Sequence, residues 1–356
     1  MKMIDSQMGL DPALEQEWKE YIKIVSNNKS MKYIRKSVEF TKSKKAYITG
    51  NCIMNDCVIG ITNSSREVLC YDTIHKKYIQ FGKVKIGTFK WTGGCCYKNK
   101  VYGFPRKENS VLMIDPMEKS CAEKKLGLSY KGEHHYGGVL TPDGVVYQPP
   151  RNTDHVLVIN LNTFETSHIP IPEADEKARY SASVLHPSGR IYLIPEYGYK
   201  VAILNPKTKQ IELIGEKFDH LVFGCVVGYD QNIYGYSKEG DGILKIDTIT
   251  NKIEWICREI GNPDCYGSIV GVNGKIYGVP AASQKIYEFD IENQRAVAIF
   301  WLEEKGIAKC AGACMDENGT IYMLPCFGEH TYILEADKVV NKVHSVEDNM
   351  FINTCY

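Results

Sequence analysis

Three histidines have the clearest capacity for catalysis in this chain: the adjacent His134 and His135, and His220. An imidazole can bind a metal ion or exchange a proton near neutral pH. Because neighbouring residues of an extended strand point to opposite sides, we expect only one of His134 and His135 to face a common site. No paired carboxylates, G-x-S-x-G segment or H-E-x-x-H segment accompanies them. A metal-assisted lyase or hydrolase using these histidines is therefore an alternative function, and the sequence predicts no defined metal site and no cofactor.

Basic side chains form a second candidate set. Guanidinium and ammonium groups arranged in a ring could hold a phosphate, a carboxylate or an acidic peptide. Acidic residues in the same segments would compete with such a ligand. The expected ring consists of Lys90, His134, Arg179 and Lys309, with Arg106 and Arg151 outside it.

Aromatic residues form a third set, since their flat rings can serve as platforms for sugars. The candidates are Trp91, Tyr136, Tyr180 and Tyr197. Of the 23 tyrosines, six occupy a repeated structural position, which weakens an argument from tyrosine content. Carbohydrate binding is therefore the second alternative.

These candidates fall within an internal repeat, which indicates how they are positioned. A Tyr that follows Val or Ile returns every 42 to 45 residues, and an acidic or amide residue follows it thirteen positions later each time. The first copy has Ile in place of Tyr. The landmark positions are Ile59, Tyr102, Tyr147, Tyr192, Tyr234, Tyr277 and Tyr322.

Each copy reads as four short strands. A strand of small residues such as Gly93-Gly94 leads through a turn such as Pro142-Asp143-Gly144 to the Tyr strand, and an alternating strand and a fourth strand follow. Seven such units predict an all-β fold, a seven-bladed β-propeller of four-stranded antiparallel blades. We expect the small-residue strand to be innermost, because seven strands converge there on one axis.

The half-unit IY-x-x-P followed by VL-x-ID-x-x-T resembles the YVTN-type and kelch-like propeller repeats over residues 46 to 345. The Gly-His and Trp-Asp pairs of WD40 units are missing, and so are the double glycine and regular Trp of kelch units. The resemblance therefore implies a fold and no catalytic residue, since one fold hosts many functions.

The loops that enter the innermost strands and the loops between second and third strands should open on one face around the axis. Residues at the entrance to each innermost strand differ in every blade, which suits an asymmetric ligand. The expected ligand-binding residues are Lys90, Trp91, Arg106, His134, His135, Arg151, Arg179, Tyr180, Asp264 and Lys309.

The chain outside the repeat is interpreted as an N-terminal extension over residues 1–45, a propeller over 46–348 and a tail over 349–356. Asp11-Pro12 and the spacing of Leu14, Trp18 and Tyr21 predict an amphipathic helix over about 11–26, able to pack on the propeller or to contact a partner or a second copy. A strand near Ser37 could add to an outer blade and close the ring.

Composition narrows the classes of protein and partner. The 43 Lys and Arg equal the 43 Asp and Glu, so nucleic acid is not an expected partner. No long apolar run and no secretion signal occur, and the 13 cysteines form no C-x-x-C pair, which indicates a cytoplasmic protein with reduced thiols. We predict a non-catalytic binding or scaffold propeller that recognises a peptide, a protein or a small anionic ligand at its axial face.

Overall fold

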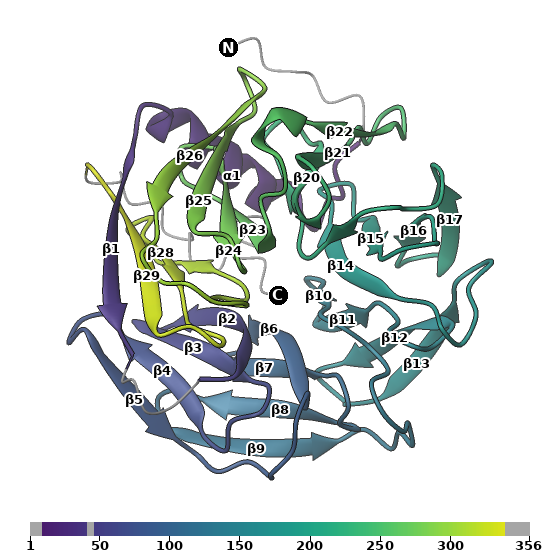
Figure 1. Ribbon diagram of the computed structural model, residues 1–356. Coiled ribbons are helices and arrows are strands. Elements are labelled where there is room, and N and C mark those ends of the chain that lie inside the picture. Colours follow the sequence, from purple (N-terminus) through teal and green to yellow (C-terminus); the bar gives the residue numbers. More distant parts are fainter. Residues whose placement is uncertain (1–8, 41–45, 339–356) are drawn as a thin grey trace.

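The repeated units fold as seven antiparallel sheets around one axis, a seven-bladed β-propeller (Figure 1). The computed structural model describes residues 9–40 and 46–338, so the tail proposed for 349–356 lies outside the described residues. In every blade the small-residue strand is nearest the axis, as predicted. Apolar side chains from adjacent sheets form the core between the blades.

The first three blades follow one another along the chain. Blade 1 contains β2 (Ile48–Met54), β3 (Cys57–Thr62), β4 (Val68–Asp72) and β5 (Lys77–Phe81). Blade 2 contains β6 (Trp91–Tyr97), β7 (Lys100–Pro105), β8 (Ser110–Asp115) and β9 (Ser120–Lys125). Blade 3 contains β10 (Val139–Leu140), β11 (Val145–Gln148), β12 (His155–Asn160) and β13 (Thr166–Pro170).

The next three blades repeat this order. Blade 4 contains β14 (Tyr180–Leu185), β15 (Ile191–Pro195), β16 (Val201–Asn205) and β17 (Gln210–Ile214). Blade 5 has its inner strand split into β18 (Leu221–Val222) and β19 (Val226–Val227), followed by β20 (Ile233–Glu239), β21 (Ile243–Ile246), β22 (Ile253–Ile256) and a short 3-10 turn, η1 (Arg258–Ile260). Blade 6 contains β23 (Cys265–Val270), β24 (Ile276–Pro280), β25 (Lys285–Asp290) and β26 (Arg295–Trp301).

The seventh blade joins the two ends of the described chain. It contains β27 (Cys314–Met315), β28 (Ile321–Met323) and β29 (His330–Ala336), and its outermost strand is β1 (Tyr33–Glu39). β1 pairs with β29 along its whole length, from Tyr33 opposite Ala336 to Glu39 opposite His330. The segment near Ser37 is therefore the strand that closes the ring, and this part of the expected extension belongs to the seventh blade.

The helix α1 (Glu15–Asn28) packs across the end of the propeller that carries the turns between first and second strands. It begins four residues later than predicted, because a carboxylate oxygen of Asp11 and the Asp11 carbonyl accept hydrogen bonds within a turn that precedes the helix. The Tyr21 hydroxyl donates to the carbonyl of Val227 at 3.3 Å, and Trp18 is buried beside it. The apolar face of α1 is thus covered by the chain itself. No described helix is long and apolar enough to cross a membrane.

A glycine with positive φ interrupts the innermost strand in six blades. The pairing register shifts at this point in several blades, as at Trp91 and Gly94. Only glycine adopts these φ values without strain, so this residue is small because of its backbone and not only because space at the axis is short. The glycines are Gly50, Gly93, Gly137, Gly224, Gly267 and Gly312, with φ between 59° and 123°; blade 4 has Ala182 there.

Candidate binding site at the axial mouth

The loops entering the innermost strands and the loops between second and third strands meet at one end of the propeller, here called the axial mouth. Backbone hydrogen bonds connect them from blade to blade. Asn63 N donates to Tyr47 O, Lys90 N to Asn63 O, Arg106 N to Lys90 O and His134 N to Arg106 O, all within 3.0 Å. The expected convergence of these loops is therefore observed, and the positions of one blade can be compared with those of the next.

The first entrance position attaches each blade to the loop of the preceding blade. Lys90 is fully buried, and its Nζ donates to Ser65 O at 2.6 Å and Lys85 O at 2.9 Å. Lys309 is equally buried and donates to Ala282 O at 2.8 Å and Gly306 O at 2.9 Å. Burial lowers the pKa of Lys90 to about 8 and also lowers that of Lys309.

The prediction that Lys90 and Lys309 present positive charge to a ligand is therefore wrong. Their ammonium groups donate to backbone carbonyls of the neighbouring loops instead of facing a ligand. The variation at this position, interpreted from the sequence as evidence of an asymmetric ligand, follows in these blades from the shape of the neighbouring loop.

The second entrance position belongs to the core in all seven blades. Trp91 is fully buried and its indole N–H donates to Ser110 O at 2.8 Å, while the Tyr180 hydroxyl donates to Lys200 O at 3.0 Å. Neither ring offers a free face, so Trp91 and Tyr180 are not sugar platforms or ligand contacts. The seven residues are Ile48, Trp91, His135, Tyr180, Val222, Cys265 and Cys310.

In blades 3, 5 and 6 the third entrance position, which precedes the positive-φ glycine, carries an aromatic residue that turns towards the axis. Three partly buried aromatic rings meet there: the ring centroids of Tyr136 and Phe223 are 5.6 Å apart, and those of Phe223 and Tyr266 are 5.0 Å apart. Blades 3 and 5 are not neighbours in the ring, so the contact between Tyr136 and Phe223 forms near the axis, and Tyr266 of the adjacent blade 6 extends this aromatic cluster. The other four residues at this position are Thr49, Thr92, Ser181 and Ala311.

His134 and His135 do not point to opposite sides as predicted. Their Nδ1 atoms lie 2.9 Å apart and both rings are buried, because the chain is not an extended strand at this point and β10 begins only at Val139. His134 Nε2 lies 3.0 Å from Glu108 O, and His135 Nε2 lies 3.2 Å from His155 O. Burial lowers the pKa of His134 to about 4 and that of His135 well below its usual value.

His220 does not join this pair. Its ring stacks on Trp255 with centroids 4.4 Å apart, and its Nδ1 lies 2.6 Å from Asp219. The neighbours of His134 and His135 are instead Tyr130 and other histidines of blade 3. Among residues 9–40 and 46–338, no three His, Cys, Asp or Glu side chains are placed to hold a metal ion. The expected catalytic grouping of His134, His135 and His220 is therefore not formed.

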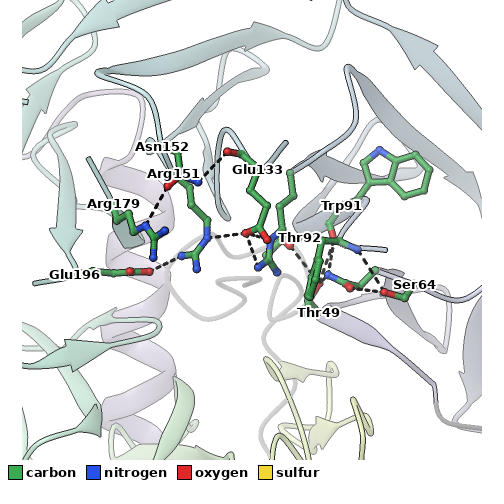
Figure 2. Close-up of polar contacts among 12 residues, drawn as sticks. Thr49, Ser64, Trp91, Thr92, Glu133, Arg151, Asn152, Arg179 and Glu196 are labelled. Atoms are coloured by element: carbon green, nitrogen blue, oxygen red, sulfur yellow. Dashed lines mark hydrogen bonds and ion pairs between the residues drawn. The ribbon is translucent and has the colours of Figure 1, made fainter. Parts of the chain in front are cut away.

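Two arginines and two glutamates form a charged network at the mouth (Figure 2). Glu133 accepts hydrogen bonds from Arg106 Nη2 and Arg151 Nε, both at 2.8 Å. Arg151 also forms an ion pair with Glu196. Burial opposes ionisation of Glu133, but the two guanidinium groups hold its pKa below its usual range. Both Arg106 and Arg151 also lie over the ring of Tyr136, with Cζ at 4.9 and 5.1 Å from its centroid.

Arg179 lies beside this network but keeps most of its hydrogen-bonding capacity. Its Nε donates to Asn152 Oδ1 at 3.1 Å, and Asn152 in turn donates to Glu133 O, as Figure 2 shows. The residue is exposed, and no acidic partner lies within ion-pair distance among the described residues. The two terminal nitrogens of Arg179 therefore remain available on a side chain whose position is already fixed.

The remaining predicted ligand residue, Asp264, pairs with Lys238 at 2.6 Å between Nζ and Oδ1. This contact joins blade 6 to the end of β20 in blade 5. Lys238 also lies over the ring of Tyr266, 5.5 Å from its centroid. Asp264 thus has the same connecting role as Lys90 and Lys309, through a side-chain ion pair.

Glu133 was not among the residues predicted from the sequence, although a signal for it exists. It directly precedes the first entrance position, where the other copies have Ala46, Phe89, Ala178, His220, Pro263 and Ala308. Glu133 is the single acidic residue in this column of the repeat. A comparison of the seven repeat copies at the position directly before the first entrance position would have identified Glu133.

Comparison with known proteins identifies the fold and nothing finer. No protein-family model matches the chain, and no curated protein matches it in sequence. Among solved structures it is similar to virginiamycin B lyase from Staphylococcus aureus, with a TM-score of 0.70 and 14% identity over 85% of this chain and 99% of that one. A streptogramin B lyase has a TM-score of 0.71 and 15% identity over 85% and 98% of the two chains. The WD40 β-propeller domain of Doa1 has a TM-score of 0.63 and 12% identity over 86% and 97%. The resemblance to YVTN-type and kelch-like repeats accordingly stays at the level of the fold.

Proposed function

We propose that this protein is a non-catalytic binding propeller whose axial mouth holds an acidic ligand, either a segment of a partner protein or a small anion. The observation that supports the proposal most directly is the state of Arg179. This side chain is exposed, is fixed through Asn152 and has terminal nitrogens without an acidic partner in the described chain. A planar guanidinium in this condition suits a carboxylate or phosphate.

The charge around Arg179 supports an anion rather than a cation. The charges of Arg106 and Arg151 are balanced by Glu133 and Glu196, so the charge of Arg179 is the excess in this group of five. The network also holds Arg151 next to the site at no further ordering cost, because its side chain is already fixed by two carboxylates.

The lyase alternative has little support in the residues. The names of two structural neighbours describe lyases, but at 14–15% identity they speak for the fold alone. His134 and His135 are buried and hydrogen-bonded, and His220 lies apart from them. We therefore do not assign them a catalytic role.

Isothermal titration with a tetraglutamate peptide and with inorganic phosphate tests the proposal. We expect binding of at least one of these probes to wild type, and a loss of about tenfold or more in affinity for Arg179→Glu. The matched control is Arg295→Glu, because Arg295 is exposed on β26, the outermost strand of blade 6. Equal loss in both variants, or no binding of either probe to wild type, would contradict an acidic ligand at the mouth.

A further inference from the structure

The axial mouth is divided into a charged half and an apolar half. Residues four positions after the Tyr landmark form one ring around the mouth, and in blades 1 to 5 they are all polar or charged. In blades 6 and 7 they are Ala281 and Cys326, both buried and apolar. The ring reads Asn63, Arg106, Arg151, Glu196, Lys238, Ala281 and Cys326.

The third entrance position is divided as well. Thr49, Thr92 and Ser181 are small and polar, and their hydroxyl groups bond within the protein, as in the 2.5 Å bond from Ser181 to Val222 O. Phe223 and Tyr266 place large, partly buried rings on the side of blades 5 and 6. No hydrogen bond involves the Tyr266 hydroxyl among the described residues, and the ion-paired Lys238 lies over the Tyr266 ring, so this half offers aromatic surface with one free hydroxyl and one ion pair at its edge.

Tyr136 joins the two halves. One side of its environment is charged, with the Cζ atoms of Arg106 and Arg151 about 5 Å from its ring centroid. The other is aromatic, with Phe223 at 5.6 Å. An acidic group at Arg151 and Arg179 and an aromatic group at Phe223 and Tyr266 would thus lie on either side of a single tyrosine ring.

We propose that the ligand of the axial mouth carries an acidic group next to an aromatic group. The proposal rests on the function proposed above and names the chemical class of the ligand. Two consecutive residues of a protein segment, such as Glu-Phe or Asp-Trp, carry an acidic group next to an aromatic group. Their Cα atoms are about 3.8 Å apart, and both side chains are long enough to reach the Tyr136 ring from two sides. An aromatic carboxylic acid such as phenylacetate has the same chemistry in a small molecule.

Both parts of the ligand have a physical reason to bind. The acid forms charge-assisted hydrogen bonds with guanidinium groups, which are stronger than neutral ones. The ring extends an existing aromatic cluster in the edge or tilted geometry already seen between Tyr136, Phe223 and Tyr266. A simple anion would use only the charged half, and a simple apolar ligand would leave the Arg179 nitrogens to water.

The test is a titration series followed by NMR, with three peptides and one small molecule as probes. The peptides are acetyl-Gly-Glu-Phe-Gly-amide, the same peptide with Gln for Glu, and the same peptide with Ala for Phe; the small molecule is phenylacetate. We expect the Glu-Phe peptide to bind most tightly. The Gln peptide should bind about tenfold or more weakly, and the Ala peptide about threefold to tenfold more weakly.

Two variants assign these losses to the two halves. Arg179→Gln should remove the preference for Glu over Gln while keeping the preference for Phe over Ala. Phe223→Leu, which keeps apolar volume, should do the reverse. Phenylacetate binding as tightly as the peptide would favour a small molecule over a protein segment as the source of this chemistry.

Failure of this inference differs from failure of the proposed function. If the Glu-Ala peptide or phosphate binds as well as the Glu-Phe peptide, the mouth still binds acids and the aromatic requirement is overturned. If none of the acidic probes shifts the resonances of Arg179 or its neighbours, both proposals are overturned together.

Discussion

Lys90 and Arg179 occupy the same position of the repeat, in blades 2 and 4, but they differ in solvent exposure and in hydrogen bonding. Lys90 is completely buried and its ammonium is used by two backbone carbonyls. Arg179 is exposed and uses one nitrogen to bond Asn152. Equal sequence positions and equal charge therefore do not mean equal availability. The availability of the cation to a ligand depends on the loop of the preceding blade, which either offers carbonyls to the side chain or leaves it at the surface.

The same contrast extends to the two sides of the mouth. In blades 2 and 7, the lysines at this position complete the packing between blades. In blades 3 and 4, charged side chains form the network around Glu133, which fixes Arg151 and leaves Arg179 free. We interpret the first arrangement as structural and the second as functional, and the following variants can break or sharpen that distinction.

The largest effect is expected for Lys90→Met, which leaves the carbonyls of Ser65 and Lys85 without a donor. We expect the free energy of unfolding to fall by about 3 kcal/mol, since the variant loses two hydrogen bonds from a charged group and such bonds are worth about 1.5–3 kcal/mol each. Arg179→Met should change it by less than about 0.5 kcal/mol, as is usual for exposed residues. Urea denaturation of both variants measures the difference. Similar losses in the two would remove the distinction between structural and available cations.

Acid should destabilise the protein through the His134 and His135 pair. Burial lowers the pKa of His134 to about 4, so the folded state binds fewer protons than the unfolded state, whose histidine pKa is about 6.5. The stability is complete above pH 6.5 and is lost as the pH falls towards 4, by about 2 kcal/mol for His134 at pH 5.

Unfolding curves at pH 7.5 and pH 5 for wild type and His134→Gln measure this contribution. His186 is also buried with a pKa lowered to about 4, so the variant should keep part of the acid sensitivity. A variant with the full sensitivity of wild type would mean that His134 is already protonated in the folded protein.

Glu133→Gln should have a smaller effect, because the network is partly open to solvent. Removing this charge leaves Arg106 and Arg151 close together with less compensation, and we expect a loss of about 1–2 kcal/mol. The loss should shrink in high salt, since ions screen the repulsion between the arginines. Glu176→Gln, on an exposed loop, is the control. A loss independent of salt would indicate that Glu133 acts through packing rather than charge.

The frame of the molecule was predictable because it depends on repetition. The landmark position recurs seven times, with Tyr in six copies, and hairpin turns and small inner strands recur with it, so a departure in one copy does not hide the pattern. The closing strand near Ser37 was accessible for a related reason, since a ring needs its last blade completed.

The mouth was less predictable because it depends on the direction of single side chains. Alternation along an ideal strand suggests that His134 and His135 diverge, but the chain reaches β10 only at Val139 and the two rings meet. In blades 3, 5 and 6 the third entrance position, not the first, turns towards the axis. Alignment therefore located the loops of the mouth but missed Glu133, Phe223 and Tyr266. The backbone geometry that distinguishes Lys90 from Arg179 could not be derived from the residue types.

The central claim is that Arg179 serves a ligand and contributes little to stability, and a ligand-induced thermal shift tests both parts together. Unfolding temperatures of wild type and Arg179→Gln would be measured with and without the Glu-Phe peptide at many times its dissociation constant. We predict the same unfolding temperature for both proteins without peptide, and an increase with peptide for wild type alone, because a ligand that binds only the folded state stabilises it. An equal increase in both proteins, or a variant already destabilised without peptide, would contradict the account.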